Sequence, residues 1–177
     1  MKITISGLPG SGTTTVAKIV SKKLGLKLIS AGDVFRQFAS KKGMTVEEFS
    51  KYAEQNPDID KLIDKTQQEL AEAEENVVVE GRLSGWFVKD ADLRVWIFAD
   101  PEIRYRRIAQ REGKDLAIAR HETRLREDLE KRRYQKFYSI DINDWTIYDI
   151  ILNSGKFDAE TIAELIIMAA KSAYKKD

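Results

Sequence analysis

Five short apolar runs alternate along the chain with longer amphipathic stretches. The runs lie at about 2–6, 26–30, 77–79, 93–98 and 148–152. The intervening stretches have the spacing of helices, at about 13–24, 33–40, 101–111, 115–137 and 158–171. Short apolar strands separated by helices are typical of a parallel sheet covered on both faces. We therefore expect an α/β fold with three layers, α/β/α, around a five-stranded parallel sheet.

Local signals mark further helices between the second and third runs. Thr45 and Glu48 form a capping-box pattern at the start of a short helix. Pro57 suits the first position of another helix, which is expected to end near residue 75. One stripe of that helix is predicted to face the core, formed by Ile59, Leu62, Ile63, Thr66 and Leu70.

Two segments look too long for simple crossovers between strands. Residues 33–75 place several helices between strands two and three, and residues 104–136 place a basic helical pair between strands four and five. Ligands of such sheets bind at the carboxyl ends of the strands, where both segments begin. We expect both to close over that edge, within a single domain whose core is 1–32, 76–103 and 137–177.

Composition narrows the class of protein. The chain has 177 residues, 42% of them hydrophobic and 33% charged, with a net charge of +1 and no cysteine. Near-zero net charge gives no general attraction to nucleic acid or membranes, and the absence of cysteine excludes disulfides and thiol chemistry. No apolar stretch has the length of a membrane span, and the N-terminus shows no signal peptide. We expect a cytoplasmic protein, monomeric, with no nucleic-acid or membrane partner.

A glycine-rich loop follows the first strand. Residues 7–14 fit the pattern G-x-x-x-x-G-K-[ST], except that Thr13 replaces the lysine. Between a strand and a helix, such a loop directs backbone N–H groups at one point, where an anion such as phosphate can bind. The alternative interpretation is a glycine turn with a structural role only. The lysine normally reaches the β and γ phosphates, so another cation must replace it. The predicted ATP-binding residues are Gly7, Leu8, Pro9, Gly10, Ser11, Gly12, Thr13, Thr14 and Thr15.

Two oxygen ligands suit a magnesium ion. Thr14 occupies the hydroxyl position that usually binds Mg²⁺ in such loops, and Glu80 ends the third strand. Glu80 is expected to act through water; the alternative is a strand-end charge that faces solvent. Gly81 allows close backbone approach, and Arg82 then points toward the same edge of the sheet.

Arginines are the candidate cations. Residues 104–136 carry twelve Lys or Arg against six Asp or Glu, although solvated helix faces explain much of such an excess. Arg107 and Arg111 share one helical face, which suits contact with the phosphoryl group in transfer. Arg126, Glu130 and Arg133 share another, which suits an acceptor phosphate.

Other chemistry-bearing residues are fewer. Asp33 is either the N-cap of a helix or, with Arg36, part of an acceptor site. His121 has no second histidine or cysteine to build a zinc site, and a surface or packing role is expected. The three tryptophans, Trp86, Trp96 and Trp145, are expected in the core.

These segments, in this order, resemble the nucleoside monophosphate kinases, and specifically the archaeal type of cytidylate kinase, over essentially the whole chain. That family also carries threonine in place of the lysine, and segments 30–36, 80–86, 126–134 and 138–149 resemble its other motifs. The resemblance implies a P-loop kinase fold with a monophosphate-binding insert at 33–75, a lid at 104–136, and the reaction ATP + CMP ⇌ ADP + CDP with Mg²⁺. The implied CMP-binding residues are Ser30, Gly32, Asp33, Arg36, Gly81, Arg82, Arg126, Glu130 and Arg133; the expected catalytic residues are Thr13, Arg107, Arg111 and Arg126.

Alternative functions remain open on the sequence. The first alternative keeps phosphoryl transfer from ATP but has another small acceptor, namely dCMP, UMP, AMP or shikimate. A missing lysine also fits a nucleotide-binding switch without turnover, although acceptor-side arginines have no use in a switch. RNA binding by the basic helices is weakly supported, because aromatic side chains do not interleave with the charges before Tyr134.

Overall fold

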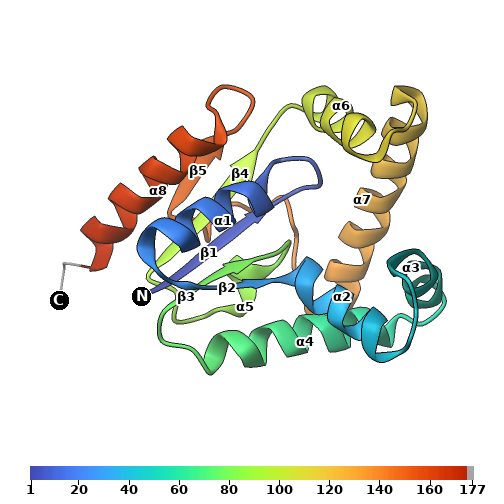
Figure 1. Ribbon diagram of the computed structural model, residues 1–177, viewed down its shortest axis with the longest axis horizontal. Coiled ribbons are helices and arrows are strands. Elements are labelled where there is room, and N and C mark those ends of the chain that lie inside the picture. The colour runs from blue at the N-terminus through green and yellow to red at the C-terminus, as the bar shows by residue number, and fades with distance from the viewer. Residues whose placement is uncertain (175–177) are drawn as a thin grey trace.

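A single parallel sheet organises the molecule. The computed structural model describes residues 1–174, and its five strands lie in the order β2-β3-β1-β4-β5 (Figure 1). All four pairings are parallel. This confirms the expected five-stranded parallel sheet. The strands are β1 (Lys2–Gly7), β2 (Lys27–Ser30), β3 (Val77–Glu80), β4 (Leu93–Phe98) and β5 (Ile150–Asn153).

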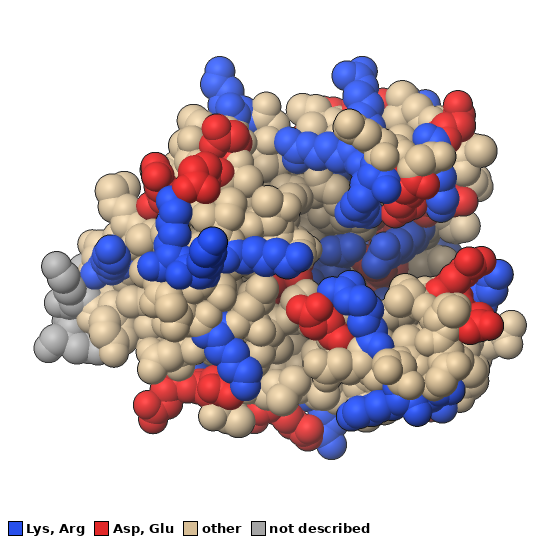
Figure 2. Space-filling view, in the orientation of Figure 1, with Lys and Arg blue, Asp and Glu red and all other residues tan. Residues whose placement is uncertain are grey.

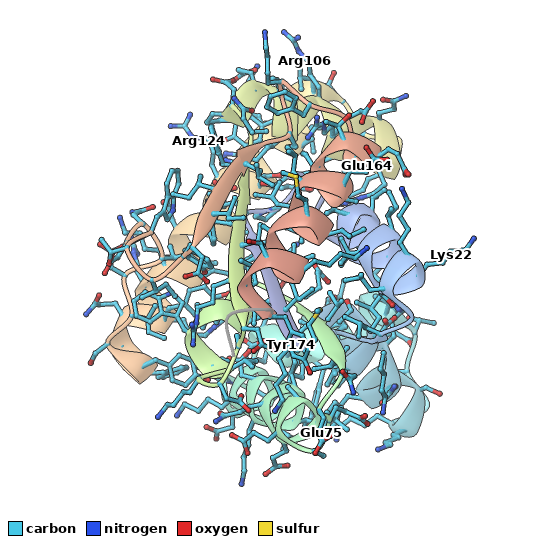
Figure 3. The ribbon with its side chains drawn as sticks, turned by 90° about the vertical axis from the view of Figure 1, so that its left-hand side faces the viewer. Lys22, Glu75, Arg106, Arg124, Glu164 and Tyr174 are labelled. Atoms are coloured by element: carbon cyan, nitrogen blue, oxygen red, sulfur yellow. The ribbon has the colours of Figure 1, made fainter. Side chains whose placement is uncertain are left out.

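Helices α1 (Thr13–Leu24) and α8 (Ala159–Tyr174) cover one face of the sheet and lie side by side (Figure 3). Alternate residues of the central strands point toward them: Ile3 and Ile5 are fully buried and share one core with Val16 and Ile162. The period-2 pattern of a strand places such residues on the same face. Asp158 begins α8 as predicted, because its carboxylate accepts a hydrogen bond from the backbone of Thr161 at 2.8 Å.

The opposite face is closed by an aromatic cluster. Trp96 of β4 packs against Trp145, with ring centroids 5.7 Å apart, and against Tyr148. Trp86 packs on the same cluster from α5 (Ser84–Phe87), a short helix that the sequence pattern did not predict. The core role predicted for the tryptophans is confirmed. Tyr148 also explains why β5 starts later than predicted, since this residue belongs to the cluster and not to the strand.

Three helices connect β2 with β3: α2 (Ala31–Lys41), α3 (Val46–Glu54) and α4 (Asp58–Glu72). They enclose a small core of their own around Phe49. The capping box is confirmed, because the Thr45 hydroxyl accepts from the Glu48 backbone at 3.2 Å and the Glu48 carboxylate accepts from the Thr45 backbone at 2.7 Å. The N-cap role considered for Asp33 is wrong, since α2 begins two residues earlier.

The apolar stripe predicted for α4 is confirmed at Ile59 and Ile63, which pack in the core around Phe49, and is wrong at Leu62 and Leu70. Leu62 is 46% exposed and Leu70 is 38% exposed, whereas the helix buries Ile63, Gln67 and Ala71. The buried face meets polar partners, including the backbone carbonyl of Glu80. Polar side chains are therefore satisfied there, and hydrophobic periodicity alone does not detect such a face.

Between β4 and β5 lie α6 (Pro101–Glu112) and α7 (Leu116–Tyr138). Gly113 ends α6 with a φ of 62°, and Asp115 caps α7 by accepting from the backbone of Ala117. The helices α6 and α7 stand on one side of the open edge of the sheet, and α2 and α3 stand on the other (Figure 1). His121 is exposed on α7. Within residues 1–174, no helix combines the length and apolar character of a membrane span.

Candidate active site

The glycine-rich loop has the backbone of an anion cradle. Gly10 and Gly12 take the left-handed conformation, with φ of 80° and 87°. At Gly10 a side chain is excluded by contact as well, because a Cβ would lie 2.7 Å from the carbonyl oxygen of Arg104. α1 begins directly after the loop, at Thr13. Free N–H groups at the start of a helix favour a bound anion such as a phosphate.

Thr13, in the position of the usual lysine, points inward. Its side chain is buried, and its hydroxyl donates to Glu80 Oε1 at 2.7 Å. Thr14 donates to the same oxygen at 3.3 Å, and Ser30 donates to Oε2 at 2.8 Å. The structure therefore joins these predicted residues through one carboxylate. Thr13, predicted to bind ATP, thus directs its hydroxyl at Glu80, while Thr15, also predicted to bind ATP, is exposed.

A buried glutamate binds two of the arginines that the sequence predicted for the acceptor phosphate. Glu130 of α7 is 8% exposed. Arg82 donates to it through Nε at 3.1 Å and also donates to the carbonyl oxygen of Gly7 at 3.2 Å. Arg126 donates to its other oxygen at 2.9 Å. Burial raises the pKa of Glu130, but the charges of Arg82 and Arg126 outweigh that effect and lower it overall. Glu130 is therefore ionised and orders both guanidinium groups, of which that of Arg82 also contacts the phosphate loop.

The other two arginines predicted for the acceptor site have separate partners. Arg133 pairs with Asp60 of α4 at 2.7 Å, although Glu130 lies on the same side of α7. Arg36 pairs with Asp33 at 2.5 Å, and both side chains are about half exposed. A Cβ at Gly32 would lie 3.3 Å from the Arg36 guanidinium, so the helix start leaves room for that group. Figure 2 shows a hollow between the α6–α7 side and the α2–α4 side, with basic side chains gathered in its depth.

The predicted lid arginines lie at different depths. Arg107 donates to the carbonyl oxygen of Gly10 at 3.2 Å and to both oxygens of Ser154, so it touches the phosphate loop. Arg111 has 63% of its side chain exposed and contacts Glu112. The structure does not bring Arg111 to the loop.

Arg104 is a site residue whose place the sequence analysis missed. We placed it in the basic segment, yet it is 4% exposed and lies beneath the loop. It donates to the carbonyl oxygen of Pro9 at 2.9 Å and to that of Ala99 at 3.3 Å, and it pairs with Glu127 of α7. The buried positions of α6 recur with helical spacing and include this residue, so an apolar-stripe analysis of α6 would have detected it.

A family model described as the cytidylate kinase-like family matches residues 2–156. The chain belongs to this family. A cytidylate kinase from Archaeoglobus fulgidus is 77% identical to it, over 97% of this chain and 95% of the relative. A cytidylate kinase from Methanobrevibacter smithii is 47% identical, over 97% of this chain and 99% of the relative. The resemblance noted in the sequence is confirmed.

Solved structures agree on the fold of this cytidylate kinase-like chain. A shikimate kinase from Aquifex aeolicus superposes with a TM-score of 0.64 at 20% identity, and the match covers 100% of both chains. A shikimate kinase from Bacteroides thetaiotaomicron also gives 0.64, at 17% identity, covering 97% of this chain and 98% of the other. At such low identity these likenesses concern the fold alone, and they confirm the expected P-loop kinase architecture.

Proposed function

We propose that this protein transfers the terminal phosphoryl group of ATP to CMP, giving ADP and CDP. Membership of the cytidylate kinase-like family supports the reaction. The observation that carries it is the position of Arg82, which joins the buried Glu130 to the carbonyl oxygen of Gly7. A pair of arginines held beside a phosphate loop suits a second, phosphorylated substrate. A nucleotide-binding switch has no need of it.

On the donor side, residues 7–15 bind the phosphates of ATP. The contacts come from backbone N–H groups of the loop and from the start of α1, because Thr13 is turned toward Glu80. Arg104 and Arg107 bind the carbonyl oxygens of Pro9 and Gly10. These contacts hold the carbonyls in place. The N–H of Ser11 donates to the carbonyl oxygen of Leu8 at 3.1 Å, so the other N–H groups of the loop are proposed to bind the anion.

The ligands offered by Thr14 and Glu80 fit Mg²⁺. Both are oxygen ligands, and their side chains lie 3.3 Å apart at the start of α1. Mg²⁺ prefers one or two protein oxygens and completes its shell with water and substrate phosphates. We propose that Thr14 binds the ion directly and that Glu80 does so through water. When bound, Mg²⁺ neutralises charge on the phosphates of ATP.

On the acceptor side, the phosphate of CMP is held by guanidinium groups. Arg82 and Arg126 are oriented by Glu130, and Arg133 is oriented by Asp60. Alignment and charge neutralisation are most of what phosphoryl transfer requires, so no covalent intermediate is needed. The remaining acceptor-site residues are proposed to be Ser30, Gly32, Asp33, Arg36, Gly81 and Glu130.

Two segments are proposed to close over the site. Residues 33–75 would carry the acceptor toward the loop, and residues 104–136 would act as the lid. Closure excludes water, which would otherwise accept the phosphoryl group. Arg111 is exposed in this structure, and closure of the lid would bring it to the transferring group. We propose that the enzyme acts as a cytoplasmic monomer, with dCMP as a second acceptor.

An acceptor panel tests the proposal. ADP release from ATP and Mg²⁺ is measured with CMP, dCMP, UMP, AMP and shikimate in turn, each against a blank without acceptor. We expect CMP to give the highest kcat/KM and the blank to give almost none. A preference for AMP or shikimate would contradict the assignment. Tight ATP binding without acceptor-dependent turnover would favour the switch.

A further inference from the structure

The face of α4 that lies against the molecule carries polar groups. Asp60, Asp64 and Gln67 follow at intervals of four and three residues, which places them on one side of a helix. Gln67 is 4% exposed, and Asp60 has 26% of its side chain exposed. Buried polar groups cost free energy unless they are paired, so a helix seldom presents three of them inward without a role.

The partners of this polar face lie along the acceptor side. Gln67 donates to the carbonyl oxygen of Glu80 at 2.7 Å, and Asp60 pairs with Arg133. Between them, Asp64 Oδ2 accepts from the hydroxyl of Tyr138 at 2.8 Å. The face thus extends from the end of β3 to α7. Asp64 is one helical turn, about 5.4 Å, from the residue that holds Arg133.

Asp64 is the residue of this face whose burial as a charged group is most unfavourable for the fold. Burial raises its pKa to about 6, while the hydrogen bond from Tyr138 and the charge of Arg133 act in the opposite direction. The neighbouring carboxylates of Asp60 and Glu130 contribute to the same rise, and the value of about 6 includes all of these effects. Within residues 1–174, only Oδ2 has a hydrogen-bond partner in the structure, which leaves Oδ1 as a free acceptor. An asparagine would keep the Tyr138 contact without a buried charge.

We propose that Asp64 reads the base of the acceptor nucleotide, with Oδ1 accepting a hydrogen bond from the exocyclic amino group of cytosine. The proposal rests on the proposed function, since it assumes a nucleoside monophosphate acceptor. The phosphate lies at Arg82, Arg126 and Arg133, and the base then extends along α4. Cytosine presents an N4 amino donor where uracil presents an oxygen acceptor, and a carboxylate distinguishes the two.

Gln67 and Tyr138 fix the position of the Asp64 side chain. Gln67 ties α4 to the end of β3, and a Cβ on Gly81 would approach its Oε1 to 3.0 Å. The hydroxyl of Tyr138 stays protonated because burial and the charge of Asp64 both raise its pKa. The Tyr138 hydroxyl therefore donates to Oδ2 of Asp64, which directs Oδ1 away from α7. Both are positioning residues for Asp64.

The test is the ratio of kcat/KM for CMP to that for UMP, measured in wild type and in Asp64→Asn. Asparagine accepts from Tyr138 through its oxygen and offers an amino donor, which suits the O4 of uracil. We expect the ratio to fall by roughly tenfold or more, with an absolute gain in kcat/KM for UMP. Asp58→Asn is the matched control, because this residue is on the same helix, 95% exposed, and lies outside the proposed site. Its ratio should equal that of wild type.

The outcomes distinguish failure of the proposed function from failure of the base-reading role of Asp64. Failure of wild type to phosphorylate CMP would contradict the proposed function. CMP turnover by wild type with an unchanged CMP-to-UMP ratio in Asp64→Asn would overturn the base-reading role, as would an equal loss on both substrates. Tyr138→Phe provides a second arm, since it keeps the carboxylate and frees its orientation. We expect a smaller fall in the same ratio, and an unchanged ratio would argue against the positioning role of Tyr138.

Discussion

The proposed donor and acceptor sides of the site use arginine in different ways. At the phosphate loop, Arg104 and Arg107 bind the carbonyl oxygens of Pro9 and Gly10, so they fix the backbone. On the acceptor side, arginines are themselves fixed: Glu130 holds Arg82 and Arg126, and Asp60 holds Arg133. The donor side thus presents oriented N–H groups, whereas the acceptor side presents oriented guanidinium groups.

The difference follows from the missing lysine. With Thr13 turned inward to Glu80, no side chain of the loop itself supplies a cation for the transferring phosphoryl group. The acceptor side has its charge already in place, and a buried carboxylate lowers the cost of ordering each guanidinium. We propose that residues of the α6–α7 segment complete the charge on the donor side, although Arg111 of this segment is exposed in this structure.

The largest effect is expected from removing the residue that joins the two sides. Arg82→Ala should lower kcat/KM for CMP by about 10³-fold, because it removes a phosphate contact. It should also destabilise the fold by about 3 kcal/mol or more, since Glu130 loses its most buried partner. Steady-state kinetics and thermal unfolding measure the two effects.

The matched variant for that experiment is Arg82→Lys, which keeps the charge but not the planar fork. If the activity of Arg82→Lys lies between those of wild type and Arg82→Ala, then the orientation of the guanidinium group matters as well as its charge. Near-normal CMP kinetics in Arg82→Ala would show that the acceptor site lies elsewhere.

A second, smaller effect is expected at Glu80. Glu80→Gln replaces the carboxylate that accepts from Thr13, Thr14 and Ser30. We expect the Mg²⁺ concentration needed for half-maximal rate to rise by about 10- to 100-fold, and a magnesium titration at fixed ATP measures it. Glu75→Gln is the control, because Glu75 is exposed at the outer edge of the molecule (Figure 3). Equal magnesium dependence in the two variants would exclude Glu80 from the metal site.

The pKa of Asp64 gives a prediction for stability. Because this pKa is raised from 3.8 to about 6, the folded protein binds the proton more tightly than the unfolded chain does. The stabilisation from that proton is complete below pH 3.8 and is lost as the pH rises through about 6. Asp64→Asn should therefore raise the free energy of unfolding by about 3 kcal/mol at pH 8, with most of the gain lost near pH 4. Denaturant unfolding at both pH values tests it, and equal stability at pH 8 would contradict a buried, costly carboxylate.

The smallest effect is expected at Thr13. Thr13→Val removes the hydrogen bond to Glu80 with little change of shape, and it should cost about 1.5 kcal/mol of stability. Thr13→Ser keeps the hydroxyl and should lose less. Thermal unfolding of both variants is the measurement. A greater loss in the serine variant would mean that the methyl group, which packs near Gly7, matters more than the hydrogen bond.

Much of the fold followed from the sequence because strands and helix ends carry local signals. The buried strand at 77–80, the capping box at Thr45 and the left-handed Gly25 and Gly113 are each set by neighbouring residues. The phosphate loop was predictable for the same reason. Its glycines are needed within a few residues of one another, where a motif can be recognised.

The parts that were missed depend on contacts between distant segments. The inward face of α4 was predicted only in part because its polar residues are satisfied by Glu80 and Tyr138, both remote in sequence. Arg104 was counted in the basic segment without a role of its own, and its contacts with Pro9 and Glu127 come from segments distant in sequence. Thr13 was expected to face the phosphate, and only the fold shows its bond to Glu80. Hydrophobic periodicity predicts that a polar residue is exposed, because it cannot detect a hydrogen-bond partner that is distant in the sequence.

The central claim is that charge on the donor side is completed by the α6–α7 segment. Its most direct test compares kcat with the Kd for ATP in Arg107→Ala and Arg111→Ala, with Arg106→Ala as a control. Arg106 is exposed on the same helix and lies at the outer edge of the molecule (Figure 3). We expect kcat to fall by about 100-fold or more in at least one test variant, while the Kd for ATP changes far less and the control behaves as wild type. Near-wild-type kcat in both test variants would contradict the account, because the missing charge would then come from elsewhere.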